Sequence, residues 1–196
     1  SAHRSGRTTI LSRAAGLATR LTGLPGWAAL PIVVCSAALG TAAFGFYWDV
    51  SIHIDDGRDP GPFANNSHYL ILLGLAGIAL AGFLAVVLGT DRKEPSSLRF
   101  AGTNVPLGGV VMLLCGSIAL MTFPADDVWH RLFGQDVTLW GPTHVLMVGG
   151  GSLATIGLWI LLVEGRRARA ADPDAPRAPL PLRVREVLAA GGFLAG

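Results

Sequence analysis

The sequence predicts an all-α fold, a polytopic membrane helix bundle made of two tandem helix-loop-helix repeats. Three observations support this prediction. Charged residues make up only 14% of the 196 residues and hydrophobic residues 51%, whereas about a quarter of a soluble domain is charged. The apolar residues are gathered in four long stretches without a charge. One pattern of Asp and His residues also occurs twice.

Each apolar stretch is long enough to cross a bilayer. A hydrocarbon core of about 30 Å needs about 20 apolar residues, and they must be helical because lipid offers the backbone no hydrogen-bond partner. We expect helices near residues 27–47, 68–89, 106–123 and 143–163. They form a first repeat, 27–89, with an outer loop at 48–67, and a second repeat, 106–163, with an outer loop at 124–142.

Lys and Arg are distributed unevenly about these helices. Thirteen of the fifteen lie in a basic N-terminal arm, 1–26, in the connection 90–105, or in a Pro-rich linker, 164–186. The other two, Arg58 and Arg131, lie in the outer loops. Because Lys and Arg collect on the cytoplasmic side of membranes, we expect a cytoplasmic N-terminus. The expected location is a bacterial plasma membrane. The basic arm and linker would then also be cytoplasmic.

The two outer connections carry the same arrangement of Asp and His. In each, an Asp precedes a His by four residues, and a second Asp follows that His by six. Another His opens the next apolar stretch, fifteen residues after the first His in one repeat and fourteen in the other. The two sets are Asp49, His53, Asp59 and His68, and Asp126, His130, Asp136 and His144.

This arrangement suits a transition metal. Asp and His at positions i and i+4 share one helical face, and a His from the next helix completes a two-His, one-carboxylate set. Imidazole suits zinc, copper, iron and nickel, and such a set with open positions is typical of non-haem iron. The predicted metal ligands are Asp49, His53, His68, Asp126, His130 and His144. Asp127 is an alternative to Asp126. Candidates to orient the imidazoles are Asp59, Asp127 and Asp136. The indoles of Trp129 and Trp140 are expected to shield the second site from water.

Other uses of these histidines stay open. Paired histidines can ligate haem, but Pro60 and Pro142 break the helix between the members of each pair, which disfavours haem. The imidazoles can also simply bond to nearby Asp residues, or relay protons in a proton-coupled transporter.

The motif D-x-x-W-H at 126–130, followed by P-T-H at 142–144, resembles the C subunit of the particulate methane monooxygenase and ammonia monooxygenase family. The resemblance covers about residues 45–150. It implies an all-helical membrane subunit, copper at both Asp/His/His sets, and oxidation of a hydrocarbon or of ammonia. The chain departs from the family pattern in its longer first His–His interval, and in having Asp126 where the family has Asn.

We therefore expect a copper-binding subunit of a membrane oxidase or monooxygenase-like complex, with the lipid bilayer and other membrane subunits as partners. A non-catalytic, metal-handling membrane subunit is an alternative. The sequence contains no phosphate-binding loop, serine-type triad or nucleic-acid module, so no nucleic-acid partner is expected. Residues 187–196 resemble the start of a further apolar helix.

Overall fold

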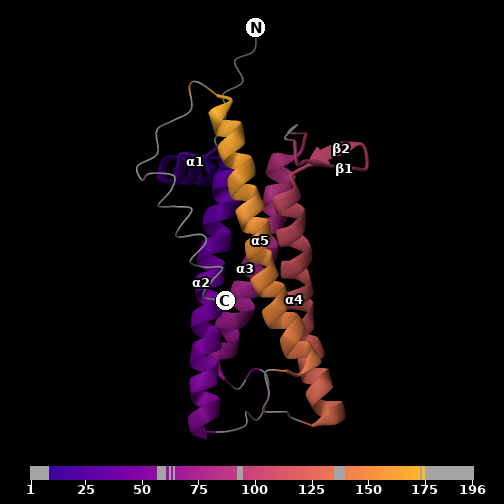
Figure 1. Ribbon diagram of the computed structural model, residues 1–196. Helices are drawn as coiled ribbons and strands as arrows, with labels where there is room; N and C mark the ends of the chain where they lie inside the picture. The colour runs from indigo at the N-terminus through magenta and orange to yellow at the C-terminus, as the bar shows by residue number, and fades with distance from the viewer. Residues whose placement is uncertain are drawn as a thin grey trace.

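Four long helices run side by side along the molecule (Figure 1). The computed structural model describes residues 9–56, 61, 63, 65–91, 95–134, 140–172 and 174. The elements in chain order are α1 (Ile10–Thr22), α2 (Gly26–Asp56), α3 (Asn66–Gly89), β1 (Leu98–Phe100), β2 (Thr103–Val105), α4 (Leu107–Phe133) and α5 (Pro142–Ala170). The two short strands pair antiparallel as a hairpin between α3 and α4.

Helices α2, α3, α4 and α5 are long and apolar enough to cross a membrane. The shortest, α3, has 24 residues, or about 36 Å at about 1.5 Å per residue. Outward-facing side chains are also apolar. Leu73, Leu80, Phe83, Leu114 and Trp159 are each at least 43% exposed. Because apolar surface of this extent is favourable in lipid and not in water, the predicted all-α membrane bundle is confirmed.

The helices extend further toward one end than their apolar stretches predict. α2 continues to Asp56 and α4 to Phe133. The first parts of the predicted outer loops, 48–67 and 124–142, are therefore helical. Hydropathy marks only the part of a helix that lies in lipid. The backbone hydrogen bonds of the helix can continue beyond that part into water. α4 even passes through Pro124, which removes one backbone donor without ending the helix.

The opposite end also differs from the prediction. The predicted N-terminal arm, 1–26, contains the helix α1, and the predicted linker, 164–186, begins inside α5, which ends at Ala170. Residues 175–196 lie outside the part of the chain that the structure describes. The expected helix start at 187–196 falls within them and stays a prediction.

Small residues let consecutive helices touch. A Cβ atom at Gly82 of α3 would lie 2.2 Å from the backbone nitrogen of Leu113 in α4. One at Gly108 of α4 would lie 2.4 Å from the backbone nitrogen of Leu161 in α5. These separations are too short for any side chain, so the helix backbones themselves are in contact, as is common between membrane helices. Met112 is fully buried beside these contacts.

A buried carboxylate joins α5 to the start of α4. Glu164 is 1% exposed and accepts hydrogen bonds from the Ser96 hydroxyl (2.6 Å), the Leu107 amide (3.0 Å) and the Gly108 amide (3.2 Å). Pro106, the residue before the first turn of α4, makes no side-chain hydrogen bond that caps the helix. Glu164 therefore caps α4 from the neighbouring helix, satisfying amides that a helix N-terminus leaves without intrahelical partners.

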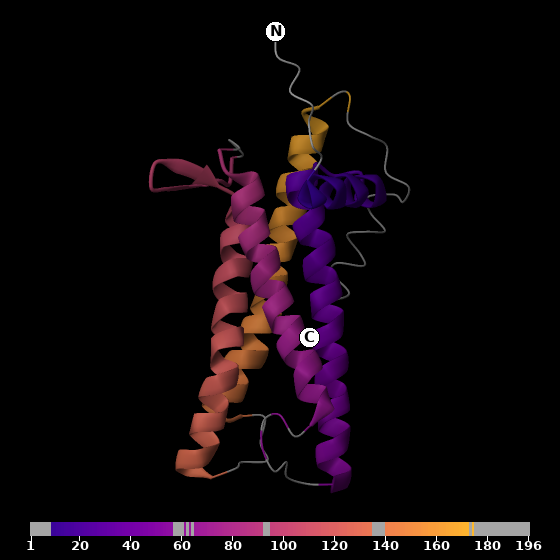
Figure 2. The same cartoon turned by 180° about the vertical axis from the view of Figure 1, so that it is seen from behind.

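The two repeats run in the same direction. α2 and α4 finish at one end of the bundle, where α3 and α5 begin, and α1, the hairpin and the last turns of α5 lie at the other end (Figures 1 and 2). Asp49 and Asp126 lie on the later turns of α2 and α4 respectively. Both Asp/His pairs are therefore at the same end of the bundle.

Candidate metal centre

The first Asp/His/His group joins the end of α2 to the beginning of α3. Asp49 and His53 lie one turn apart on α2, and the Nε2 atom of His53 is 3.5 Å from Oδ2 of Asp49. His68, in the first turn of α3, places its Nε2 atom 2.9 Å from Oδ1 of Asp49. The side chains of Asp49 and His68 are 14% and 16% exposed, while that of His53 is 40% exposed. The group thus has one side open toward solvent.

The second group repeats this arrangement between α4 and α5. His130 Nε2 lies 3.2 Å from Oδ2 of Asp126, and His144 Nε2 lies 3.5 Å from its Oδ1. All three side chains are at most 25% exposed, so this group is the more enclosed. The structure therefore brings together the Asp and both His of each predicted ligand set.

The separations between ligand atoms fit a transition-metal ion. Two ligand atoms that each lie about 2.1 Å from an ion and subtend a right to tetrahedral angle are about 3.0–3.4 Å apart. The four Asp–His separations range from 2.9 to 3.5 Å, measured from Oδ2 to the first histidine of each group and from Oδ1 to the second. In each group the three ligand atoms lie within 4.8 Å of one another. A two-His, one-carboxylate set of this size can hold a metal ion and leaves coordination positions for other ligands.

Hydroxyl groups next to the second histidines hold the carboxylates in place, although they are not part of the predicted ligand sets. Ser67 donates a hydrogen bond of 2.7 Å to Oδ1 of Asp49, and Thr143 donates a short one to Oδ1 of Asp126. The side-chain amide of Asn65 also donates a hydrogen bond to Oδ1 of Asp49, at 3.1 Å. The signal was present in the sequence, because each second histidine follows a hydroxyl residue, as Ser-His and Thr-His.

The helix starts fix where the second histidines lie. The side chain of Asn65 caps α3 by accepting a bond from the amide of Ser67, so His68 lies in the first helical turn. Pro142 opens α5 two residues before His144, a position where its missing N–H is not needed by the helix.

Asp126, and not Asp127, faces the histidines. Asp127 instead pairs with Arg131 one turn later, with separations of 2.9 Å to both Nε and Nη2. Asp127 is therefore not a member of the Asp/His/His group in the structure, which contains Asp126. Of the other expected orienting residues, Asp59 and Asp136 lie outside the described residues, and their roles stay predictions.

A backbone carbonyl lies beside the first histidine of the second site. The Nδ1 atom of His130 faces the carbonyl oxygen of Gly134 at 3.5 Å. A histidine that binds metal through Nε2 commonly turns its other nitrogen toward such an oxygen. Gly134 ends α4 with a positive φ of 84°, a conformation that favours glycine.

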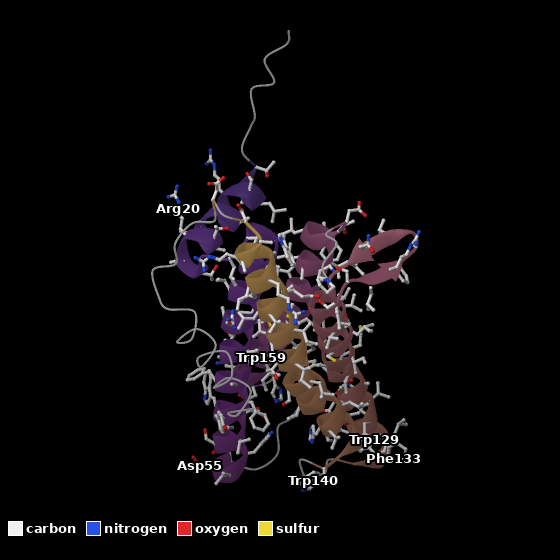
Figure 3. All side chains as sticks on the ribbon, turned by 45° about the horizontal axis from the view of Figure 1, so that its top comes forward. Arg20, Asp55, Trp129, Phe133, Trp140 and Trp159 are labelled. Atoms are coloured by element: carbon white, nitrogen blue, oxygen red, sulfur yellow. The ribbon has the colours of Figure 1, made fainter. Side chains whose placement is uncertain are left out.

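Aromatic rings surround the sites but do not all shield them. Phe123 of α4 lies edge-on to His68, with ring centroids 6.1 Å apart, so the second repeat forms part of the wall of the first site. Trp129 packs against Phe133 at 4.3 Å. Trp140 is 85% exposed at the end of the bundle (Figure 3), so the expectation that it covers the second site is wrong.

The fold and the two sites define a class of protein, a polytopic membrane protein with two Asp/His/His groups that can hold metal ions at one end of its bundle. No family model, curated protein or solved structure matches the chain.

Proposed function

We propose that this chain is the copper-binding subunit of a membrane oxidase or monooxygenase-like complex. The observation that carries the proposal is the duplication. Two groups, each with one carboxylate and two imidazole ligands within 4.8 Å, occupy equivalent places in two repeats. Chance pairing of Asp and His at a membrane surface gives no reason for two such groups at the same end of the bundle.

Copper is favoured by the ligands and by the resemblance of the motifs. Imidazole binds copper, zinc and iron, and among divalent first-row metals copper binds a given site most tightly. A copper ion held here would supply one-electron chemistry with oxygen. The role of the protein is to hold one carboxylate oxygen with Ser67 or Thr143 and to direct Nε2 of the histidines toward the metal.

The sites lie at the depth where apolar and aqueous phases meet. Asp126 comes nineteen residues after Leu107, the first residue of α4, or about 28 Å along the helix. That distance is close to the thickness of the hydrocarbon core, about 30 Å. A small apolar substrate dissolved in lipid and a polar one dissolved in water would both be able to reach this level, as oxidation of hydrocarbon or ammonia requires.

The proposal is tested by the copper content of the purified chain. We expect up to two ions per chain, one for each group. His53→Ala with His68→Ala should remove one ion, and His130→Ala with His144→Ala the other. Asp127→Asn is the matched control, because Asp127 adjoins a ligand but pairs with Arg131, and it should retain the wild-type content. A wild-type chain without stoichiometric metal after copper loading would contradict the proposal.

A proton-coupled transporter is the second candidate, and one observation favours it. Oδ1 of Asp49 accepts hydrogen bonds from Ser67 and Asn65 and lies 2.9 Å from Nε2 of His68. The protein therefore supplies hydrogen-bond partners for this oxygen without a metal ion. Absence of metal together with pH-dependent uptake in vesicles would favour the transporter. Copper that exchanges rapidly with a chelator would instead favour a metal-handling subunit without catalysis.

A further inference from the structure

Helix α1 lies across the end of the bundle rather than along it. In both views it lies across the direction of α2, at the end opposite the Asp/His/His groups (Figures 1 and 2). It has 13 residues, so it is about 20 Å long and too short to span a bilayer.

The turn into α2 fixes this orientation. Gly23 ends α1 in a left-handed conformation with φ 71°, and its amide donates to the carbonyl of Thr19 at 2.7 Å. Leu24 follows and is 1% exposed. A Cβ atom at Gly26 would lie 3.2 Å from Cβ of Ala15, so α1 packs closely on the start of α2. Ala18, on the same side of α1, is 2% exposed. The helix is therefore held against the bundle along one face.

A second, apolar face of α1 is left exposed. Ile10, Leu17 and Leu21 are 88%, 59% and 53% exposed. Their spacing of seven and four residues places them in one stripe along the helix. In a membrane protein, a short helix across the end of the bundle with such a stripe fits the boundary between headgroups and acyl chains.

Positive charge lies beside this stripe. Arg20, in the last turn of α1, is exposed and extends away from the bundle (Figure 3). Arg166 and Arg167, near the end of α5, are exposed at the same end of the molecule. The helix itself contains no acidic residue. Each arginine near an anionic membrane surface contributes about 1 kcal/mol of attraction, or about fivefold in local enrichment.

We propose that α1 is a membrane-surface anchor that binds anionic phospholipid. The side chains of Ile10, Leu17 and Leu21 enter the boundary between headgroups and acyl chains. Arg20, Arg166 and Arg167 contact the phosphate groups. The anchor lies at the end of the bundle opposite the candidate metal centres. It does not depend on their function.

Quenching of a fluorophore by brominated lipid tests the anchor. The label is attached in nanodiscs at Leu17→Cys, or at Gly16→Cys on the polar side of α1, in a chain with Cys35→Ala and Cys115→Ala. A Cβ atom at Gly16 meets nothing within 4 Å, so this control side chain fits. Leu80→Cys, on the exposed face of α3, is the positive control. Circular dichroism checks that every variant keeps its helix content.

We expect strong quenching at positions 17 and 80 and weak quenching at position 16. Brominated phosphatidylglycerol should quench the label at 17 more than brominated phosphatidylcholine at equal mole fraction, and Arg20→Gln should reduce that excess up to about fivefold. Equal quenching at 16 and 17 would overturn the proposal. So would absent quenching at 17 with strong quenching at 80, because another protein or a second copy would then cover α1. Equal quenching by the two lipids would overturn the preference for anionic phospholipid.

Discussion

The hydroxyl of Ser67 donates a hydrogen bond of 2.7 Å to Oδ1 of Asp49, across the junction between two helices. Thr143 and Asp126 form the same pair in the second repeat. Because the hydroxyls hold one carboxylate oxygen, the other, Oδ2, faces the histidine one turn later on its own helix, His53 or His130. The repeated unit is therefore a carboxylate, two imidazoles and a hydroxyl.

Removal of the hydroxyls should weaken metal binding without abolishing it. Substituting groups that orient metal ligands typically costs ten- to a hundredfold in affinity, and we expect a loss of about that size for Ser67→Ala at the first site and Thr143→Val at the second. Competition with a copper chelator measures it. Ser51→Ala is the control, since its hydroxyl bonds only to the backbone carbonyl of Trp48 among the contacts described. Unchanged affinity in both variants would show that the carboxylates hold their orientation without the hydroxyls.

Loss of the Glu164 carboxylate should destabilise the protein. Glu164→Ala leaves the amides of Leu107 and Gly108 and the hydroxyl of Ser96 without this acceptor. An unsatisfied buried donor costs about 1–3 kcal/mol. Only the bond of the Gly108 amide is fully buried, whereas those of Ser96 and Leu107 are half-buried, so we expect a total loss of about 2–4 kcal/mol, and a smaller loss for Glu164→Gln, which keeps one oxygen. Unfolding in detergent measures the difference. Asp172→Asn, at an exposed position after α5, should change little; an equal effect there would argue against capping.

Glycines at the helix contacts should not tolerate a methyl group. Gly82→Ala would place Cβ 2.2 Å from the backbone of Leu113, so α3 and α4 must separate and the melting temperature should fall. Gly149→Ala, in α5, is the matched control because nothing lies within 4 Å of its Cβ position. There alanine should be neutral or stabilise by up to about 1 kcal/mol, its helix-propensity advantage over glycine. Equal melting temperatures for the two variants would contradict the close packing.

Labelling of single cysteines from either side of the membrane tests the orientation. Trp140 is 85% exposed at the end with the Asp/His/His groups, and Phe100 is 73% exposed in the hairpin at the other end. In a chain without Cys35 and Cys115, Phe100→Cys should react only from the cytoplasmic side and Trp140→Cys only from outside. The reverse result would mean that the Lys and Arg asymmetry does not set the topology.

The sequence predicted the four spans because lipid imposes a simple rule, a run of about 20 apolar residues for each helix. It did not predict where helices stop outside lipid, because there the outcome depends on packing and capping. The predicted helix ends near residue 123, yet α4 continues to Phe133. The helix α1 was missed because its apolar residues are too few for a span and lie on only part of its surface.

The candidate ligands were predictable for a related reason. Asp and His four residues apart meet on any helix, and the duplicated spacing supplied the second histidines. Choosing between Asp126 and Asp127 requires knowing which face of α4 packs against α5. Two consecutive Asp residues in a sequence do not show this. Ser67 and Thr143 were missed because a single hydroxyl residue is too common at helix starts to stand out.

The carboxylate of Glu164 has a consequence for how the chain is made. α4 leaves the ribosome before α5, so the residue that caps its first turn is synthesised fifty-six to fifty-seven residues after the amides that it binds. Until then those amides have no cap from α5. The start of α4 is therefore completed only when α5 has entered the membrane and returned to the same side, so the second repeat is finished as a pair of helices and not one helix at a time.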